Sequence, residues 1–455
     1  TWNGAFEKAG FKNAVRVLDP PDSTQDPEFC PEDARYSVIR YFSSNIENAY
    51  GPHVADPRSG EILESDIGWF HNVMNLQTGW YFTQAIADPR SHKVPFPDSL
   101  MGELIATVAA HEFGHTIGFP HNMKASSSYP VDSLRSPSFT ARYGTAPTIM
   151  DYARFNYVAQ PGDGASLMPK VGPYDGFAVN WGYRVIPGNH SADKEQDTLR
   201  TWVRAQDTNP MLRYGRQQWM TVDPSAQMED LGDDAVAAST YGIANLRRAM
   251  GYLLDAATSP DKDYSLLNEL YDEICKQWRQ EVMHVAEHVG GVIGTYKNAD
   301  QQGIVYAPVP KEKQLRCLNF LKDFVFTTPV FLLDANVLRR IEPTGSSDRV
   351  QRMQERVLNS VLASDKFVRL IEMAAIDTAS TAVLSLTELL DNVQSSVFND
   401  LVSSKTPSDV YSRNLQRAFV QNLVTKLNPP TSSMSTGTTF TMMAAATPLS
   451  KTDVR

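Results

Sequence analysis

The feature that most constrains this chain is a segment with three histidines at fixed spacing, which reads His111-Glu112-Phe113-Gly114-His115-Thr116-Ile117-Gly118-Phe119-Pro120-His121. On an α-helix His111 and His115 lie about 40° apart and one turn displaced, so both imidazoles reach one metal ion from the same face. Gly118 favours a helix end with positive φ, and the resulting turn lets His121 return as a third ligand. Three neutral nitrogens leave one position of a zinc ion open for water, which is typical of a catalytic site.

The acidic residue inside this segment has a place of its own in such a site. Glu112 projects beside the two helical histidines, close enough to touch a metal-bound water without being a ligand. A carboxylate there is suited to take a proton from the water and to deliver it later. Two histidines around a glutamate occur by chance in long sequences, but the added Gly118 and His121 make chance a poor explanation of this segment.

Length and composition limit the partners of the chain. Its 455 residues are long enough for two or three domains, and 42% hydrophobic with 21% charged residues is ordinary globular composition. Lys plus Arg is 42 and Asp plus Glu is 52, so the net charge of −10 argues against general nucleic-acid or anionic-membrane binding. The longest apolar stretch, residues 324–333, is short and interrupted by Pro329, so we expect no transmembrane segment.

The pattern of apolar residues changes near residue 255. Before this point short β-rich runs alternate with helical segments, and a helix is predicted from Asp233-Asp234 to about Leu254. The turn-forming residues 258–261 are a linker candidate, and beyond them apolar residues recur at helical spacing. We therefore predict an α+β fold with a domain over residues 1–255, a mostly α-helical domain over 256–428 and a Ser/Thr/Met-rich tail over 429–455.

A second motif lies downstream of the histidines and reads Thr148-Ile149-Met150-Asp151-Tyr152. The extended histidine segment followed by a methionine further along the chain resembles the motif pattern of the metzincin clan of zinc endopeptidases. The resemblance implies that Met150 forms an apolar floor under the metal. The Met-x-Tyr form is similar to that of astacins and serralysins, which implies that Tyr152 is an additional zinc ligand or an oxyanion donor. A packed aromatic ring is the alternative for Tyr152.

The same resemblance implies a two-lobed catalytic domain. A twisted sheet with helices is expected up to about residue 118, and an irregular lobe with the methionine turn after it. Residues 173–183 resemble the helix that closes metzincin catalytic domains. Residues 59–68 stand where the clan has its substrate-aligning edge strand, which could bind an extended peptide by adding it to the sheet. An ordinary solvent-exposed edge is the alternative.

The wording of these motifs is closest to large bacterial, exported zinc metalloproteases with a metzincin domain, which implies an extracytoplasmic location. Metzincin domains place a β-strand before their first helix, whereas this chain begins Thr1-Trp2-Asn3 inside a predicted helix. We therefore expect that upstream sequence, including any targeting signal, is absent from this chain.

Three further groups of residues have competing explanations. His284 and His288 match an inverted zinc motif, but no third ligand is obvious, which favours interface or capping histidines. The acidic residues over 223–234 could hold Ca²⁺, although carboxylates ahead of a helix favour capping. Cys275 and Cys317 could form a disulfide or remain as buried thiols, with the latter favoured, and His71 could line the cleft.

The sequence thus predicts a zinc-dependent endopeptidase that acts on a protein or peptide substrate. His111, His115 and His121 are the predicted metal ligands, and Glu112 is the predicted general base. One alternative is a zinc hydrolase of a non-protein amide, such as a cell-wall cross-link. The other is an inactive binding module with a metzincin fold, against which the intact Glu112 argues.

Overall fold

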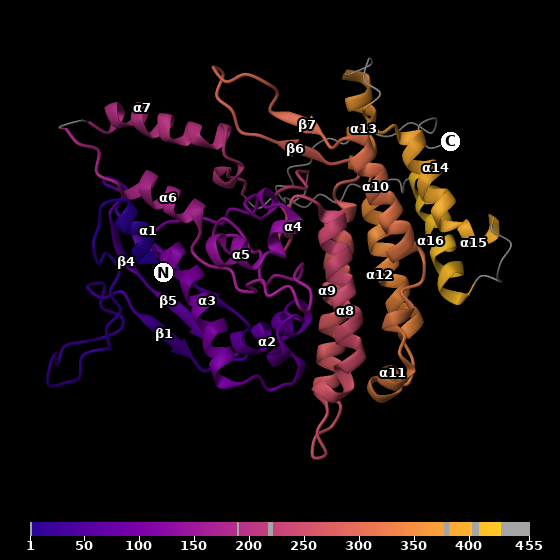
Figure 1. Cartoon of the computed structure of the whole chain (residues 1–455), viewed down its shortest axis with the longest axis horizontal. Coiled ribbons are helices and arrows are strands. Elements are labelled where there is room, and N and C mark those ends of the chain that lie inside the picture. Colours follow the sequence, from indigo (N-terminus) through magenta and orange to yellow (C-terminus); the bar gives the residue numbers. More distant parts are fainter. Residues whose placement is uncertain (1, 189–190, 217–221, 377–381, 403–408, 429–455) are drawn as a thin grey trace, which may run out of the picture. The chain divides into compact units, whose positions relative to one another are not determined.

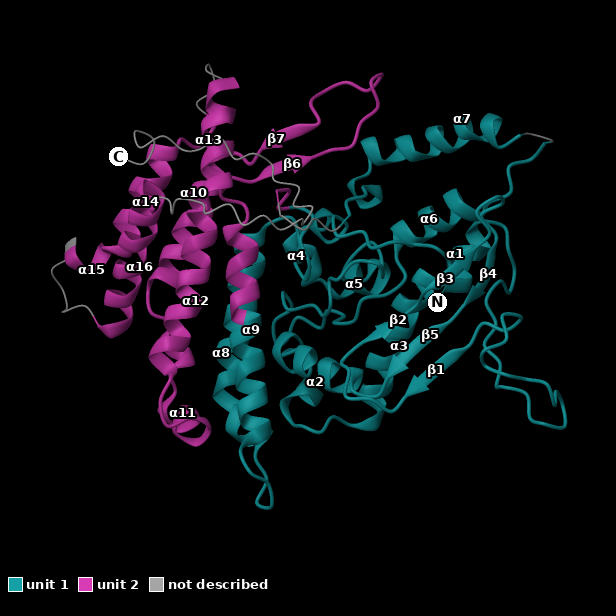
Figure 2. Cartoon of the chain, turned by 180° about the vertical axis from the view of Figure 1, so that it is seen from behind, with its two compact units in different colours: residues 1–219, 225–277 teal, residues 220–224, 278–455 magenta. Residues whose placement is uncertain are grey.

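The computed structural model describes residues 2–188, 191–216, 222–376, 382–402 and 409–428 (Figure 1). The chain divides into two compact units, residues 1–219 with 225–277 and residues 220–224 with 278–455 (Figure 2). Helices predominate and the sheets are small, which agrees with the predicted α+β class. The tail predicted over residues 429–455 lies outside the described residues.

The first unit contains the larger sheet and the helices that surround it. Its strands are β1 (Ile39–Phe42), β2 (Ala49–Tyr50), β3 (His53–Ala55), β4 (Ile62–Ser65) and β5 (Ile67–Phe70). Its α-helices are α1 (Trp2–Lys8), α2 (Val73–Gln84), α3 (Asp98–Thr116), α4 (Val131–Leu134), α5 (Pro137–Tyr143), α6 (Pro173–Tyr183), α7 (Ala192–Val203) and α8 (Ala235–Ala257). Helix α9 (Ser265–Ala286) begins in this unit, so the predicted linker at residues 258–261 lies within it.

The larger sheet has three strands in the order β1-β5-β2. Strand β5 is parallel to β1 and antiparallel to β2, with Ala49 opposite Trp69. Strands β3 and β4 form a separate antiparallel pair. Residues 59–68, predicted as one edge strand, contain β4, which pairs with β3 alone among the described strands, and the start of β5, which lies inside the larger sheet. Asp66 lies between β4 and β5. Its carboxylate accepts a hydrogen bond from Val38 N at 2.9 Å, which holds the start of β5 next to the start of β1.

Helix α3 carries the first two histidines of the sequence motif and packs against the sheet. Ile105, Val108 and Ala109 of this helix contact a buried cluster that includes Ala49 and Trp69. Since helical residues three and four apart share a face, these three residues form one apolar stripe. The stripe fixes the helix on the sheet and leaves the next turn free for polar side chains.

A second core surrounds the other side of the same helix. Trp2 and Phe6 of α1 pack with Met150 and with Val179 of α6. The indole Nε1 of Trp2 donates a hydrogen bond to Ala110 O at 2.8 Å, so α1 is attached directly to the backbone of α3. Helix α6 covers the residues predicted from the resemblance to close the domain, 173–183.

The second unit is mainly helical. Its strands β6 (Val292–Gly294) and β7 (Tyr306–Pro308) form an antiparallel pair. Its α-helices are α10 (Lys311–Leu321), α11 (Ala335–Ile341), α12 (Ser346–Val361), α13 (Ser364–Ile376), α14 (Leu386–Val397), α15 (Asn399–Val402) and α16 (Val410–Leu427). The apolar stripe of α12 is buried, as its helical spacing predicts.

Two sequence expectations concern the cysteines and the apolar helices. Cys30 is exposed while Cys275 and Cys317 are buried, and all three are thiols rather than disulfide partners. Within the described parts of the chain, every helix is too short or too polar to cross a bilayer.

Candidate metal centre

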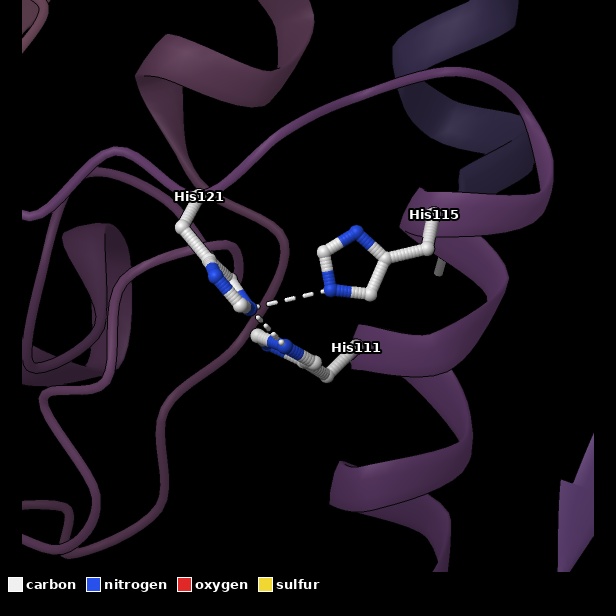
Figure 3. Close-up of side chains that lie close together, drawn as sticks. All are labelled: His111, His115 and His121. Carbon is white, nitrogen blue, oxygen red and sulfur yellow. Dashed lines mark hydrogen bonds between the residues drawn. The ribbon is translucent and has the colours of Figure 1, made fainter. Parts of the chain in front are cut away.

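Three imidazole rings converge at the end of α3 (Figure 3). His111 and His115 project from the helix, and His121 comes from the loop that follows it. The Nε2 atom of His121 lies 3.2 Å from that of His111 and 3.0 Å from that of His115. Among the described residues, these three side chains form the one group whose potential ligand atoms lie close enough together to hold a metal ion.

The loop between the helix and His121 has a defined geometry. Gly118 has a φ of +89°, a conformation that other residues adopt only with strain. Gly118 N donates to His115 O and Phe119 N donates to Gly114 O, both at 3.0 Å, which is the hydrogen-bond pattern of a Schellman helix end. The predicted role of Gly118 is confirmed, and this turn directs the chain back so that His121 faces the helix.

The ring orientations are fixed by hydrogen bonds on the opposite nitrogens. His111 Nδ1 donates to Ile149 O at 2.6 Å, and His115 Nδ1 donates to Phe119 O at 2.8 Å. Because a carbonyl can only accept, each Nδ1 carries the proton and each Nε2 presents a lone pair. The Nε2 lone pairs of His111 and His115 both face Nε2 of His121, so a cation among the three nitrogens is held by all of them when His121 also presents its lone pair.

The spacing and the charge state of the nitrogens both fit zinc. A tetrahedral zinc ion with bonds of about 2.0–2.1 Å holds its ligand nitrogens roughly 3.3 Å apart, close to the separations found here. Burial lowers the pKa of His111 to about 3 and that of His121 to about 4, and it also lowers the pKa of His115. The three rings are therefore neutral near pH 7, which is the form that binds a metal.

Met150 packs against α3 at Gly114, in a turn that a buried carboxylate stabilises. Met150 is 1% exposed. Asp175 accepts hydrogen bonds from the Thr148 hydroxyl, from Ile149 N at 3.0 Å and from Gly172 N at 2.7 Å. Burial raises the pKa of Asp175 to about 7. Asp175 is not among the site residues predicted from sequence, although an acidic residue in the first turn of a helix that follows a glycine is a capping signal.

A cavity of about 510 Å³ opens beside the histidine cluster and is lined by His111 and His115. Four segments line it: residues 48–52 around β2, one face of α2, the histidine turn of α3, and residues 149–155 around the methionine turn. The face of α2 consists of Val73, Leu76, Gln77 and Trp80, which are spaced three and four residues apart. The antiparallel strand at the cavity is thus β2, a strand too short to be recognised from sequence periodicity.

Glu112 lines the cavity and is 8% exposed. Its carboxylate forms no hydrogen bond or ion pair with the described residues, so its oxygens are available to a bound molecule. Burial raises the pKa of Glu112 to about 7, while the positive charge of Arg154 acts in the opposite direction. A carboxylate with such a pKa can accept and return a proton near neutral pH.

Tyr152 lies against the histidines. Its ring centroid is 4.2 Å from that of His121 and 5.5 Å from that of His111. Burial raises the pKa of Tyr152, so the hydroxyl keeps its proton near pH 7 and can act as a hydrogen-bond donor.

Arg154 is a residue of this cavity that sequence analysis missed. Its guanidinium carbon lies 3.7 Å from the ring centroid of Trp80 and 4.3 Å from that of Tyr152. Its Nε donates to Glu229 at 3.2 Å. Its position two residues after Tyr152 could have marked it in the sequence. Its contacts could not, because Trp80 and Glu229 are distant in sequence.

Other candidate residues lie elsewhere. His71 is exposed and does not line the cavity. Its Nδ1 is hydrogen-bonded to the Tyr41 hydroxyl. His288 Nδ1 donates to His284 O at 3.0 Å, and neither histidine belongs to a metal-holding group among the described residues. Calcium at residues 223–234 is not supported, because none of these carboxylates, all within the described ranges, forms such a group. Asp234 instead caps α8, as the alternative reading predicts.

Comparisons with known proteins give one match. A family model described as Met-zincin covers residues 93–405, a range that includes the histidines, Glu112, Met150 and Tyr152. No curated protein and no solved structure matches the chain. The family implies zinc binding, in agreement with the donor set of the three histidines. Because the match extends over more than half of its residues, the chain belongs to the Met-zincin family.

Proposed function

We propose that this chain is a zinc-dependent endopeptidase that hydrolyses peptide bonds. The observation that carries the proposal is the convergence of three neutral imidazole nitrogens beside an unpartnered Glu112 carboxylate at a cavity of about 510 Å³. His111, His115 and His121 are the proposed ligands. When bound, Zn²⁺ lowers the pKa of a water molecule and polarises a carbonyl group.

Two side chains would then handle the proton and the developing charge. Glu112 accepts a proton from the attacking water and delivers it to the leaving amine, a role that its pKa near neutrality supports. The Tyr152 hydroxyl donates a hydrogen bond to the oxyanion that forms at the former carbonyl oxygen. Its raised pKa and its position against His121 support this role.

We further propose that the substrate lies in an extended conformation along β2, between two lobes. Strand β2 is the last strand of the order β1-β5-β2, and residues 48–52 line the cavity. An edge strand of this kind binds a peptide through main-chain hydrogen bonds. The upper lobe would comprise the sheet with α2 and α3, and the lower lobe the segment that carries Met150.

The test is cleavage of a mixed peptide library by the purified chain, with zinc, with a chelator, and with the Glu112→Gln variant. We expect cleavage at internal bonds with zinc, none with chelator, and a loss of at least about 10²-fold in the variant. Cleavage of cell-wall peptides but of no protein would favour the non-protein amide alternative. An absence of all cleavage by the zinc-loaded chain would favour an inactive binding module.

The family resemblance of the sequence motifs also supports an extracytoplasmic location, which we keep as part of the proposal. Cell fractionation followed by detection with an antibody against the chain tests it. Recovery in the cytoplasmic fraction would contradict this part of the proposal and leave the proposed chemistry unaffected.

A further inference from the structure

Arg154 and its partner Glu229 are held in an unusual backbone conformation beside the cavity. Their φ values are +49° and +66°, and in the described part of the chain Asn13 is the one other non-glycine residue with positive φ. Such conformations are unfavourable for residues with a Cβ, and they concentrate at ligand-binding sites. Both members of one ion pair adopt this conformation. The fold therefore holds the Arg154 guanidinium in place at the expense of an unfavourable backbone conformation at two residues.

The contacts of Arg154 leave part of its hydrogen-bonding capacity unused. Trp80 and Tyr152 contact the guanidinium through their rings, and Nε donates to Glu229. Arg154 forms no other hydrogen bond with the described residues, so the donors on Nη1 and Nη2 remain available. Among the described residues that line the cavity, Arg154 is the one lysine or arginine.

The positive charge of Arg154 acts over the whole cavity. Burial raises the pKa of Glu112 and of Tyr152, and the charge of Arg154 opposes this rise; burial lowers the pKa of His111 and His121, and Arg154 adds to this fall. A guanidinium that is fixed between aromatic rings and only partly hydrated binds a carboxylate more strongly than a mobile surface arginine does.

A second unsatisfied polar group belongs to the same cavity. Gln77 is 2% exposed, and its Oε1 has no hydrogen-bond partner among the described residues. Gln77 lies one helical turn before Trp80 on α2, so both residues belong to the face that lines the cavity. Buried polar atoms are rarely left without a partner, so this Oε1 is available to a hydrogen-bond donor, such as a peptide N–H, of a molecule bound in the cavity.

We propose that Arg154 binds a carboxylate of the substrate, and that the chain therefore prefers peptides with a carboxylate close to the scissile bond. This inference rests on the proposed endopeptidase function and specifies its substrate class. The carboxylate belongs either to an aspartate or glutamate side chain or to the free carboxyl end of a short peptide. Both sources have the same chemistry, which a planar arginine fork recognises with two parallel hydrogen bonds.

The test compares three versions of one cleaved peptide from the library. The first has Glu next to the scissile bond and an amidated end, the second has Gln at that position and an amidated end, and the third has Gln with a free carboxyl end placed next to the site. We expect kcat/KM to be about tenfold to 100-fold higher for one or both carboxylate peptides than for the amidated Gln peptide. Equal kcat/KM for all three would overturn the proposal.

The Arg154→Gln variant should lose this preference, so that its kcat/KM for the Glu peptide equals its kcat/KM for the amidated Gln peptide, whatever its absolute rate. Arg154→Lys should retain part of the preference, because it keeps the charge but not the fork. Arg142→Gln is the matched control, because this substitution removes the same charge. Arg142 is exposed and does not line the cavity. An equal loss of kcat/KM on all peptides in Arg154→Gln would indicate a structural or oxyanion role and overturn the proposal.

A binding measurement separates this inference from the proposed activity. Fluorescein-labelled Glu and Gln peptides are titrated with the zinc-free full chain, and anisotropy gives their Kd values. We expect tighter binding of the carboxylate peptide, and loss of the difference in Arg154→Gln but not in Arg142→Gln. This result would stand even if no peptide were cleaved, in which case the endopeptidase function alone would fail. Equal Kd values for the two peptides would overturn the inference. If Arg154→Gln does not fold, Arg154→Lys takes its place in this measurement.

Discussion

The sulfur of Met150 occupies space that a side chain at Gly114 would need. A Cβ atom built on Gly114 would lie 2.1 Å from Met150 Sδ, far inside the sum of their van der Waals radii. Gly114 is the residue just before His115 in α3. The glycine in the histidine segment is thus explained by the methionine turn, a relationship that neither motif reveals alone.

We predict that Gly114→Ala displaces Met150 and the helix end. The expected loss in the free energy of unfolding is about 1–3 kcal/mol, the usual range for overpacking a core. Zinc affinity should fall with it, because His111 is oriented by Ile149 in the same turn. Thermal unfolding and zinc titration measure both effects.

The matched control is Gly102→Ala in the same helix. No atom lies within 4 Å of a Cβ at Gly102, so this change should stabilise the helix by about 0.5–1 kcal/mol. Unfolding free energies that are equal for the two variants would contradict the proposed contact between Met150 and Gly114.

Asp175→Asn should weaken the anchor of the methionine turn. The amide nitrogen cannot accept from a backbone N–H, so at least one hydrogen bond is lost, and we expect a loss of about 1–3 kcal/mol at pH 5. The variant should also bind zinc more weakly. Asp132→Asn in α4 is the control: the Asp132 carboxyl accepts none of these hydrogen bonds, so this change should leave zinc binding unaltered.

The same variant gives a pH-dependent prediction. The pKa of Asp175 is about 7 in the folded chain and near 3.8 in the unfolded chain, so the folded state binds more protons between these values. The contribution of Asp175 to the free energy of unfolding therefore falls as pH rises from about 4 to about 7. The difference in unfolding free energy between the unmodified chain and Asp175→Asn should shrink over this range. Urea unfolding at several pH values measures it, and a difference that grows with pH would contradict the burial of this carboxyl.

Removal of zinc should destabilise the chain. A ligand that binds only the folded state at 100 times its Kd contributes about 2.7 kcal/mol, so chelation should lower the melting temperature. His121→Asn should melt at the same temperature with and without chelator. His71→Asn serves as control, because His71 is exposed and does not line the cavity, and its response to chelator should match that of the unmodified chain.

Gly51→Ala should disturb the cavity without affecting the histidines. A Cβ at Gly51 would lie 2.3 Å from Glu112 O, so β2 would have to move away from α3. We expect KM for peptide cleavage to rise at least about tenfold while zinc content stays unchanged. Gly251→Ala in α8, where no atom lies within 4 Å, is the control and should leave KM unaltered.

The metal centre could be predicted from sequence because its information is local. The three histidines and Gly118 lie within one short segment, and the Schellman turn follows from helix periodicity and a glycine. The start of α8 after Asp234 has a similarly local signal in its capping carboxylate.

The rest of the cavity depends on contacts between distant segments. Arg154 is positioned by Trp80 and Glu229, each more than 70 residues away, and no periodicity connects them. Strand β2 has two residues, too few for an alternating pattern. Residues 59–68 are predicted as one strand, but β4 and β5 are separated at Asp66, which accepts a hydrogen bond from the distant Val38 N.

The hydrogen bonds behind the histidines also order the assembly of the site. His115 is oriented by Phe119, four residues along the chain, whereas His111 depends on Ile149, at a sequence separation of 38 residues. The first contact closes as soon as the helix end forms, while the second requires a long loop to close against its chain entropy. His115 is thus oriented by local structure alone, whereas the orientation of His111 on the same helix requires the methionine turn to be docked. We therefore expect binding of a metal by all three imidazoles to require this long-range tertiary contact as well as the local helix end.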